Sequence, residues 1–303
     1  MRTTKSLVIV ASFLIFSCSS LAVAPSPETA AAQWQPFAEE AGAADTGLAY
    51  YAGRVSRPRL EFNALRVDLS HPGLRIFAAG GADGRADDGR FLSVKVSSFV
   101  RANNLTAGIN ALPFDPVSGR EGEPRTNIGI VVADGVMVSP PYAQFDALVF
   151  YADGSAAIMS QSAIESAALI DNAVGGFHRI LEGGELVPRV LAEKARHPRS
   201  AAGISPDGRY LYLLVIDGRR LGSVGSTEAE TALLLRALGA TEGINFDGGG
   251  STALALRYPG GKIRVVNTPI HRQIPGRERA VAGCLGIGMG AVEFTQPSPG
   301  QGY

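Results

Sequence analysis

Short apolar segments, separated every few residues by glycine or proline, run along most of this chain. Segments such as 60–69, 147–151 and 210–216 have the length and composition of single strands in a β-meander. Glycine accounts for 37 of the 303 residues, which is about 12% against a usual share of roughly 7%. Because no Gly-x-y period explains this excess, we expect many tight turns between strands, and some turns close to a ligand.

The turn and helix signals agree with this pattern. Asp-Gly or Gly-Gly pairs between strand-like segments indicate hairpin turns, at 134–135, 153–154, 207–208 and 260–261. One short helix is expected within 93–103. The clearest helix is 227–238, because Thr227 and Glu230 have the spacing of a capping box and Gly239 can end it. Many strands and few helices predict an α+β fold, with mixed or antiparallel β-sheets and a few flanking helices in a single large domain.

The charge balance excludes several classes of protein. Lys and Arg together number 28, Asp and Glu also number 28, and charged residues make up only 18% of the chain while hydrophobic ones make up 46%. A chain this apolar is not intrinsically disordered. A net charge of zero gives no global attraction to nucleic acid or to an anionic membrane surface, so no nucleic-acid partner is expected. Any recognition of an anion must therefore be local.

The amino terminus has the organisation of a secretory signal. Arg2 and Lys5 precede the apolar run 7–16, and small residues follow, which together indicate a signal peptide over 1–24. The apolar run is too short to span a bilayer, which takes about 20 residues. An alternative processing site is Cys18, which would carry a lipid anchor and give the one expected contact with a membrane. Either route predicts an exported protein, periplasmic or extracellular.

The rest of the chain divides into three parts. Residues 25–46 are rich in Ala, Pro and Glu and are interpreted as a linker, 47–292 as the folded domain, and 293–303 as a flexible tail. Once the signal is removed, Cys284 is the only cysteine left. It lies in an apolar strand-like segment, and we expect it to be a small buried hydrophobe rather than a nucleophile.

The strongest local feature is a strand that runs into three glycines. Since side chains alternate faces along a strand, Ile244 and Phe246 point into the core while Asn245 and Asp247 point together to the other face. Gly248–Gly250 then offers unhindered backbone N–H groups that can form an anion-binding nest. A carboxylate and an amide beside such donors suit a polar substrate with phosphate or hydroxyl groups. The alternative is a hairpin whose aspartate only caps the turn.

Several common catalytic and metal-binding patterns are absent from the sequence. The four histidines lie far apart, without i, i+4 pairing or neighbouring cysteines, so a metal site is not expected. There is no Gly-x-Ser-x-Gly elbow, P-loop or dinucleotide fingerprint, and no cofactor is expected. Polar residues instead stand singly at strand ends, where any one of them is most often a solvated charge or a turn residue.

Six motifs, in order over about 60–288, resemble those of the phosphodiester glycosidase family. They are Gly108–Asn110, His197–Ser200, Asp217–Arg219, Gly225–Thr227 followed by Glu230, Asn245–Thr252 and Glu278–Val281. The fifth resembles the family signature Asn-x-Asp-Gly-Gly-Gly-Ser. The chain departs from the family after Asn110, where Ala-Leu-Pro-Phe replaces the usual Gly-Gly-Phe-Phe.

The resemblance implies hydrolysis of a sugar-1-phosphodiester or a related glycoside in an envelope glycan or exopolysaccharide, with a carbohydrate or sugar phosphate as substrate. On this basis Asp247 is expected to act as general base or nucleophile at the anomeric carbon, held by Asn245. Glu230 and Asp217 are candidates for the second catalytic carboxylate. The alternatives are that Glu230 only completes the capping box, and that Asp217 forms a salt bridge with Arg219.

The same resemblance suggests the substrate-binding residues. Arg199 and Arg279 would hold the phosphate or acidic substituent, Asn110 would bind sugar hydroxyls, and the amides of Gly248–Gly250 would stabilise negative charge. Phosphate is a good leaving group, so the departing oxygen needs less proton donation than it does in an alkyl glycoside.

Two other functions stay open on the sequence. One is a non-catalytic envelope protein that binds a glycan through the same polar face. The other is a metal-dependent phosphodiesterase that attacks the same linkage at phosphorus instead of carbon.

Overall fold

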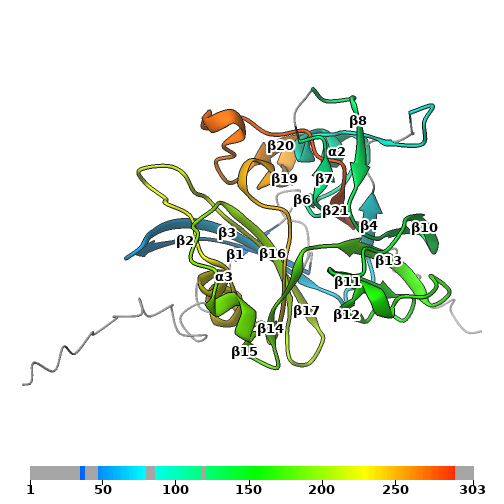
Figure 1. Cartoon of the computed structure of the whole chain (residues 1–303), viewed down its shortest axis with the longest axis horizontal. Coiled ribbons are helices and arrows are strands. Elements are labelled where there is room, and N and C mark those ends of the chain that lie inside the picture. The colour runs from blue at the N-terminus through cyan, green and yellow to red at the C-terminus, as the bar shows by residue number, and fades with distance from the viewer. Residues whose placement is uncertain (1–34, 38–46, 80–85, 118–119, 291–303) are drawn as a thin grey trace, which may run out of the picture.

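Antiparallel β-sheets make up most of the structure, a computed structural model that describes residues 35–37, 47–79, 86–117 and 120–290 (Figure 1). Within these residues, every pairing between named strands is antiparallel. The expected signal peptide with Cys18, the expected tail and most of the expected linker lie outside the described residues.

The main sheet has the strand order β1-β2-β3-β17-β16-β18-β14-β15. In chain order these strands are β1 (Gln35–Pro36), β2 (Leu48–Ser56), β3 (Arg59–Asp68), β14 (His178–Glu182), β15 (Glu185–Leu186), β16 (Arg199–Ile204), β17 (Tyr210–Ile216) and β18 (Glu242–Asn245). Strand β17 is apolar at consecutive positions because both faces of the sheet are covered. Its Leu213 and Val215 face the core between the sheets, whereas Leu214 and Ile216 face a helix on the opposite side.

Two five-stranded sheets and one small sheet complete the β-structure of the described residues. The second sheet has the order β10-β9-β13-β11-β12, and the third β20-β19-β6-β21-β4. The second sheet comprises β9 (Val131–Ala133), β10 (Val136–Ser139), β11 (Asp146–Tyr151), β12 (Ala156–Ser160) and β13 (Ile170–Gly175). The third comprises β4 (Leu74–Ala79), β6 (Ala107–Asn110), β19 (Leu254–Tyr258), β20 (Lys262–Val265) and β21 (Cys284–Met289). The small sheet comprises β5 (Phe91–Leu92), β7 (Phe114–Asp115) and β8 (Pro124–Asn127).

One hydrophobic core joins the three larger sheets. Leu65 and Leu213 from the main sheet, Leu148 from the second, and Ile109 and Leu285 from the third are all fully buried in it. Because the three sheets share this core, the described residues form a single domain. Cys284, at the start of β21, is buried beside it with a free thiol, and burial raises the pKa of that thiol, which fits the expected hydrophobic role.

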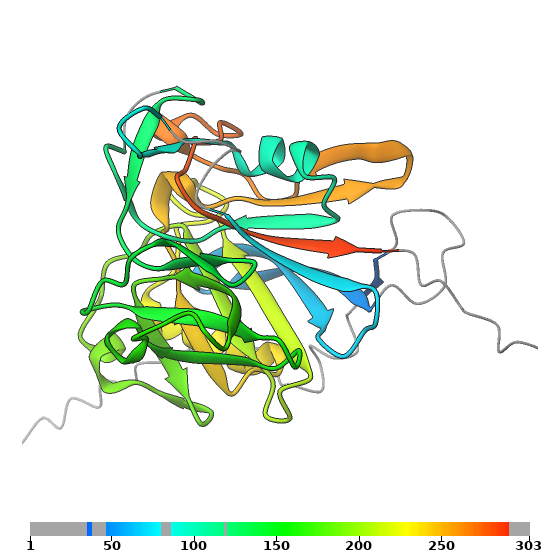
Figure 2. The same ribbon diagram turned by 90° about the vertical axis from the view of Figure 1, so that its right-hand side faces the viewer.

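Two α-helices occur in the described part of the chain, and each covers the outer face of a sheet. Helix α3 (Glu228–Leu238) packs on β14, β16 and β17, and α2 (Val96–Ala102) packs on β19, β6 and β20 (Figure 2). Helix α3 begins with the expected capping box, in which the Thr227 hydroxyl accepts from the Glu230 N–H and the Glu230 carboxylate accepts from the Thr227 N–H. It ends at Gly239, whose φ of 115° is in the left-handed region.

Short 3₁₀ turns connect several strands. They are η1 (Gln161–Ala163), η2 (Pro188–Leu191), η3 (Gly249–Ser251), η4 (Pro259–Gly261) and η5 (His271–Gln273). Turns η3 and η5 contact each other, although they are far apart in the sequence, and this contact positions the functional site.

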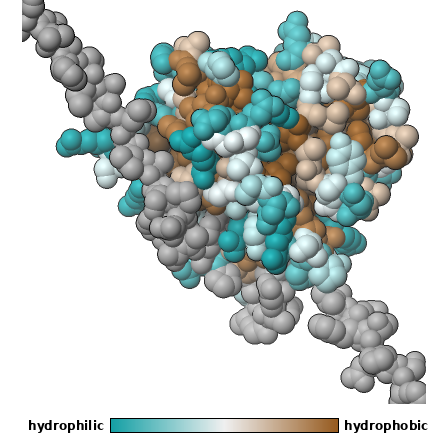
Figure 3. Space-filling model, turned by 90° about the horizontal axis from the view of Figure 1, so that it is seen from below, coloured by the Kyte–Doolittle hydropathy of each residue, from teal (hydrophilic) through white to brown (hydrophobic). Residues whose placement is uncertain are grey.

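The surface mixes polar and apolar side chains. On the face seen in Figure 3, hydrophobic side chains form several separate groups between hydrophilic ones. No helix within the described residues is long and apolar enough to cross a membrane.

The structure confirms the expected antiparallel sheets, the helix within 93–103 and the helix that follows Thr227, but the fold is more β-rich than an even α+β mixture. Strands β13 and β14 were not predicted, because Asp171, Asn172 and His178 interrupt their apolar pattern. The strand expected to run through Asp247 ends earlier, at Asn245.

Three described residues fall in the segment expected as a linker. Gln35 and Pro36 pair with β2, and the buried Phe37 makes a T-shaped ring contact with Tyr258 at a centroid distance of 5.4 Å. Part of this segment therefore packs on the domain.

Candidate active site

Asp247 lies where the main sheet meets the third sheet. The chain leaves β18 after Asn245, and the Phe246 N–H still donates to the Ser200 carbonyl of β16 at 2.8 Å. The Asp247 N–H then donates to the Ala111 carbonyl at 2.8 Å, just beyond the end of β6. The aspartate is thus held by its backbone between two sheets, which fixes the direction of its side chain.

The Asp247 carboxyl is placed in an environment that favours its neutral form. Burial raises the pKa of this carboxyl to about 6, against opposing effects from the Ser251 hydroxyl, the Arg279 guanidinium and the Gly248 N–H. A carboxyl with a pKa in this range can accept a proton at neutral pH more readily than an exposed aspartate can. Of the predicted catalytic carboxyls, Asp247 is the one best placed for acid–base or nucleophilic chemistry.

The three glycines after Asp247 are in close contact with other groups. A Cβ atom placed on Gly250 would lie 2.6 Å from Nη2 of Arg279, and one on Gly249 would lie 3.2 Å from Nη2 of Arg219. A Cβ on Gly248 would lie 2.6 Å from the Pro198 carbonyl oxygen. The glycines are therefore required so that two guanidinium groups can lie directly on the loop.

A histidine holds each of these arginines. Nε of Arg279 donates to Nδ1 of His271 at 3.2 Å, and Nη2 of Arg219 lies 3.3 Å from Nδ1 of His197. Burial and the neighbouring arginine charges lower the pKa of both imidazoles, so each ring is neutral at pH 7 and can accept a hydrogen bond. Arg279 also donates to the Ser251 hydroxyl at 3.2 Å.

The result is a cationic site beside one carboxyl. Burial, and then the charge of Arg219, lower the pKa of Arg279, whereas Asp247 raises it. The two arginines are therefore close enough to repel each other, and an anion bound between them would relieve this repulsion. Guanidinium groups are well suited to phosphate because they can donate two parallel hydrogen bonds.

Arg219 was not among the residues predicted for substrate binding. It follows the Asp217-Gly218 pair at the end of β17, and its φ of 57° is unusual for a residue other than glycine. Its position at the end of a central strand was a usable signal, but the sequence could not show that it contacts Gly249.

Asn110 has a different position from the one expected. Its Nδ2 donates to the Asp247 carbonyl at 2.6 Å, and its Oδ1 accepts from the Ser200 hydroxyl at 2.7 Å and the Ala253 N–H at 3.1 Å. The side chain is only 1% exposed. These contacts tie the Asp247 loop to both sheets and leave little of the side chain for sugar hydroxyls.

Arg199 is also used within the protein. Its guanidinium donates to the carbonyls of Ser226 at 3.3 Å and Ala195 at 3.4 Å, and it forms an ion pair with Glu228 at 3.5 Å. Glu228 in turn contacts Nε2 of His178 at 2.9 Å. Arg199 therefore lies in a buried cluster at the start of α3 and is not brought together with Arg279.

Asn245 does not hold Asp247 through any hydrogen bond in the structure. It is 1% exposed, and its Oδ1 has no hydrogen-bond partner among the described residues. In the sheet it lies between His178 and Ala201, on the α3 side.

The two other candidate carboxylates have structural partners. The Glu230 carboxylate accepts two hydrogen bonds from Arg196, both at 2.6 Å, in addition to its capping contact with Thr227. The Glu230 carboxylate therefore completes the capping box of α3, which was the alternative to a catalytic role.

Asp217 forms a salt bridge with Arg220 at 2.8 Å, and not with Arg219, the partner considered as the alternative to a catalytic role. Its carboxylate also accepts from the Asn267 side chain at 3.2 Å and from the Thr268 N–H at 2.9 Å. Asp217 thereby connects the loop that carries Arg219 to the segment that leads to Arg279.

Within the part of the chain that the structure describes, no group of three or more His, Cys, Asp or Glu side chains could hold a metal ion. The expected absence of a metal or other cofactor stays a prediction.

Comparison with known proteins identifies the family. The chain belongs to the phosphodiester glycosidase family, whose sequence profile matches residues 103–288. A prophage-derived uncharacterised protein of Bacillus subtilis is 29% identical over 174 residues, which is 53% of this chain. The chain spans only a quarter, 25%, of the length of that relative.

Three solved structures share the fold. The catalytic domain of zebrafish N-acetylglucosamine-1-phosphodiester alpha-N-acetylglucosaminidase, auto-inhibited by its pro-peptide, is similar with a TM-score of 0.60 and 19% identity, over 84% of this chain and 87% of that one. A Burkholderia pseudomallei protein described as a candidate for export gives a TM-score of 0.54 at 17% identity, over 76% and 74% of the two chains. A hypothetical Synechocystis protein gives a TM-score of 0.53 at 14% identity, over 80% and 62%.

Proposed function

We propose that this protein hydrolyses the bond between a sugar and a phosphodiester, breaking it on the carbon side. The observation that carries this proposal is the pair of guanidinium groups, Arg219 and Arg279, that lie on a glycine loop beside the Asp247 carboxyl. Two arginines suit a phosphate, and a carboxyl with a raised pKa suits attack at an adjacent carbon. Membership of the phosphodiester glycosidase family supports the same chemistry.

The proposed reaction needs only groups of this chain and water. The phosphate of a sugar-1-phosphodiester binds to Arg219 and Arg279, with the anomeric carbon facing Asp247. Asp247 takes a proton from a water molecule while the water oxygen bonds to that carbon. The bond from carbon to the phosphate oxygen breaks, and its electron pair leaves with the phosphomonoester, whose charge the arginines stabilise. If Asp247 acts instead as nucleophile, its oxygen bonds to the carbon first and water releases the sugar afterwards.

The replacement of the family's Gly-Gly by Ala111-Leu112 is accommodated in this site. Ala111 contributes the carbonyl that receives the Asp247 N–H. The Leu112 side chain is buried and fits against Gly283, where a Cβ atom would lie 2.5 Å from Leu112 Cδ1. The departure therefore leaves the backbone support of Asp247 in place, which favours a catalytic site over a purely glycan-binding one.

The substrate class to test first follows from the name of the zebrafish relative, which acts on an N-acetylglucosamine-1-phosphodiester. We propose an envelope glycan or exopolysaccharide with such a linkage as the natural substrate. The decisive experiment incubates the purified protein with a panel of sugar-1-phosphodiesters and nitrophenyl glycosides, with and without EDTA, in ¹⁸O-labelled water. We expect turnover of a diester, ¹⁸O in the sugar, and no effect of EDTA.

The Asp247→Asn variant is the matched test of the catalytic role. We expect turnover to fall at least about a hundredfold, because the amide can neither take a proton nor attack carbon, while the circular dichroism spectrum is unchanged. Retained activity would remove Asp247 from the mechanism. Binding of every diester without turnover by the wild type would support the glycan-binding alternative, and ¹⁸O in phosphate with loss of activity in EDTA would support the metal-dependent phosphodiesterase.

We also propose that the protein is exported, with a signal peptide at 1–24 or a lipid anchor at Cys18, a linker at 25–46, a domain at 47–292 and a tail at 293–303. The basic and apolar pattern of the amino terminus supports export, and so does the Burkholderia relative. Mass spectrometry of the mature protein from cell fractions tests this proposal. An intact amino terminus in the cytoplasmic fraction would refute it.

A further inference from the structure

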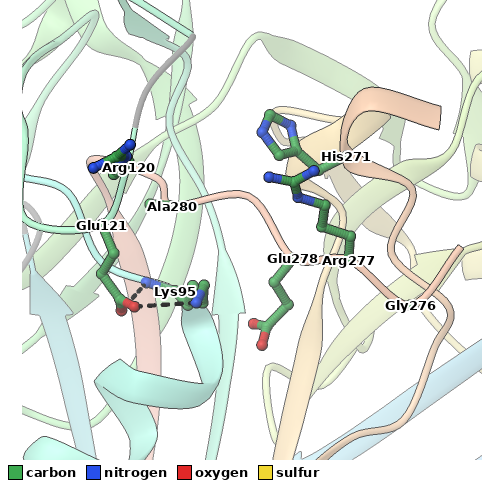
Figure 4. Close-up of a pocket in the computed structure, with 8 residues that line it drawn as sticks. All are labelled: Lys95, Arg120, Glu121, His271, Gly276, Arg277, Glu278 and Ala280. Atoms are coloured by element: carbon green, nitrogen blue, oxygen red, sulfur yellow. Dashed lines mark hydrogen bonds and ion pairs between the residues drawn. The ribbon is translucent and has the colours of Figure 1, made fainter. Parts of the chain in front are cut away.

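A cavity of about 390 Å³ lies beside the proposed phosphate site (Figure 4). Its wall includes the charged or polar side chains of Lys95, Arg120, Glu121, His271, Arg277 and Glu278. In Figure 4, Lys95, Arg120 and Glu121 stand on one side of it, and His271, Arg277 and Glu278 stand on the other. None of these residues was among the sequence-predicted substrate-binding residues.

The cavity and the proposed phosphate site share one side chain, that of His271. His271 lines the cavity, and its Nδ1 accepts from Nε of Arg279 at 3.2 Å. Four residues of the segment 276–280 line the cavity: Gly276, Arg277, Glu278 and Ala280. Arg279, which lies between them in the sequence, instead contacts Gly250 and Ser251. The same segment therefore presents groups to two neighbouring sites.

The carboxylates of this cavity are already engaged. Glu121 accepts from the Lys95 backbone N–H at 2.8 Å and pairs with its ammonium group at 3.3 Å. Glu278 accepts from both the N–H and the hydroxyl of Ser97, at 3.1 and 2.5 Å. Burial raises the pKa of the Glu278 carboxyl, whereas the two hydrogen bonds from Ser97 lower it.

Two arginines of the wall remain without a salt bridge, although the charge of Arg120 lowers the pKa of the Glu123 carboxyl. Arg120 and Arg277 form no salt bridge with any other described residue. Backbone hydrogen bonds hold the segment that carries Arg277. The Arg277 carbonyl accepts from the His271 N–H at 3.0 Å, and the Gly276 N–H donates to the Pro269 carbonyl at 2.8 Å. The cavity thus has an excess of positive charge on a backbone that is already ordered, which favours an anionic ligand.

We propose that this cavity is a second anion subsite, which binds a phosphate group in the aglycone of the substrate. The inference rests on the proposed function, because it assigns the part of the substrate beyond the scissile phosphate. The first phosphate binds to Arg219 and Arg279, and the next phosphate of the chain binds to Arg120 and Arg277 on the other side of His271. The preferred substrate is then a glycan joined to a phosphate-containing polymer, and not a diester of a simple alcohol.

The kinetic test compares two synthetic diesters of the same sugar-1-phosphate. One has a methyl aglycone and the other has a glycerol phosphate aglycone, which carries the second phosphate. For the wild type we expect a KM at least about tenfold lower for the second diester. In Arg277→Gln and Arg120→Gln we expect this ratio of KM values to approach one. Arg101→Gln, at an exposed arginine of α2, is the control, and its ratio should match the wild type.

Equal KM values for the two diesters in the wild type, or a ratio unchanged in both arginine variants, would overturn the inference. If neither diester is hydrolysed, the proposed function fails, and the subsite is tested by binding alone. Calorimetry with inorganic phosphate is then done in the Arg279→Gln background, which weakens the first site. Phosphate binding that is retained there and lost in Arg279→Gln/Arg277→Gln supports the subsite, and no difference between these two proteins excludes it.

Discussion

Asp247 and its immediate neighbours set the pH behaviour expected of this protein. The pKa of about 6 exceeds the ordinary value of 3.8 because the carboxyl is buried. Between about pH 4 and pH 6, Asp247 is therefore protonated in the folded protein but ionised in the unfolded chain. The contribution of this group to the free energy of unfolding is greatest at low pH and falls as pH rises through this window.

The activity is expected to follow the opposite direction. A general base or nucleophile must be ionised, so kcat/KM should rise with pH below about 6 and level off above it. His197 and His271 should not cause a second change in kcat/KM near neutral pH, because the pKa of each imidazole is lowered. The measurement is kcat/KM of the best diester from about pH 3 to about pH 8. A limb near pH 4 would contradict the environment assigned to Asp247.

Gly250 offers a second prediction at the residue scale. In Gly250→Ala the new Cβ would lie 2.6 Å from Arg279 Nη2, so the guanidinium must move away from the loop. We expect kcat/KM to fall by about a hundredfold, as is typical when a group in an active site is displaced by about 1 Å. Gly222→Ala is the control, because its Cβ would meet Glu61 at an ordinary 3.6 Å. Equal activity of both variants would contradict the contact.

The position of Glu230 in the first turn of α3 gives its carboxylate a structural role. The capping box and the paired contacts with Arg196 account for its carboxylate. Because glutamine can also complete a capping box, Glu230→Gln should keep kcat within about threefold of the wild type. Thr227→Ala should lower the free energy of unfolding by about 1 kcal/mol. Denaturant titration and diester turnover of the two variants are the measurements, and a large loss of kcat in Glu230→Gln would restore Glu230 as a catalytic candidate.

At the scale of the whole molecule, the site exists because the main and third sheets meet there. Asn110, at the end of β6 in the third sheet, supports the carbonyl of Asp247, which follows β18 in the main sheet. Asp217, at the end of β17, receives the Thr268 N–H from the segment after β20. Polar groups at strand ends thus join the two sheets and hold the loops of the candidate site in a fixed relation.

Asp217→Asn tests this connection. An amide cannot accept from Arg220, Asn267 and Thr268 with the charge of a carboxylate, so we expect a loss of roughly 1–3 kcal/mol in the free energy of unfolding. We also expect KM for the diester to rise more than kcat falls, because Arg219 and Arg279 lose their relative placement. A variant with wild-type stability and a hundredfold lower kcat would instead indicate that Asp217 acts in the chemistry.

The difference between these local and long-range contacts explains what the sequence could predict. The capping box and the turn at Asp134-Gly135 depend on residues within a few positions of one another, and the structure has them as expected. The contact of Arg219 with His197 depends on how the chain continues beyond two paired strands, β17 and β16, of the main sheet. The contact of Arg279 with Gly250 depends on how the third sheet approaches the main sheet. Nothing in the spacing of Arg199 and Arg219 shows which one turns toward α3.

The place of β21 in the third sheet has a consequence for synthesis of the chain. Residues 284–289 lie between β6 (107–110) and β4 (74–79), and pair with both. The third sheet cannot close until almost the whole domain has left the ribosome. Contacts between such distant segments form slowly, so a nascent chain stays unfolded for longer than one with local pairing. Such a delay would suit the proposed export, because only a polypeptide that has not yet folded passes through a narrow translocation channel.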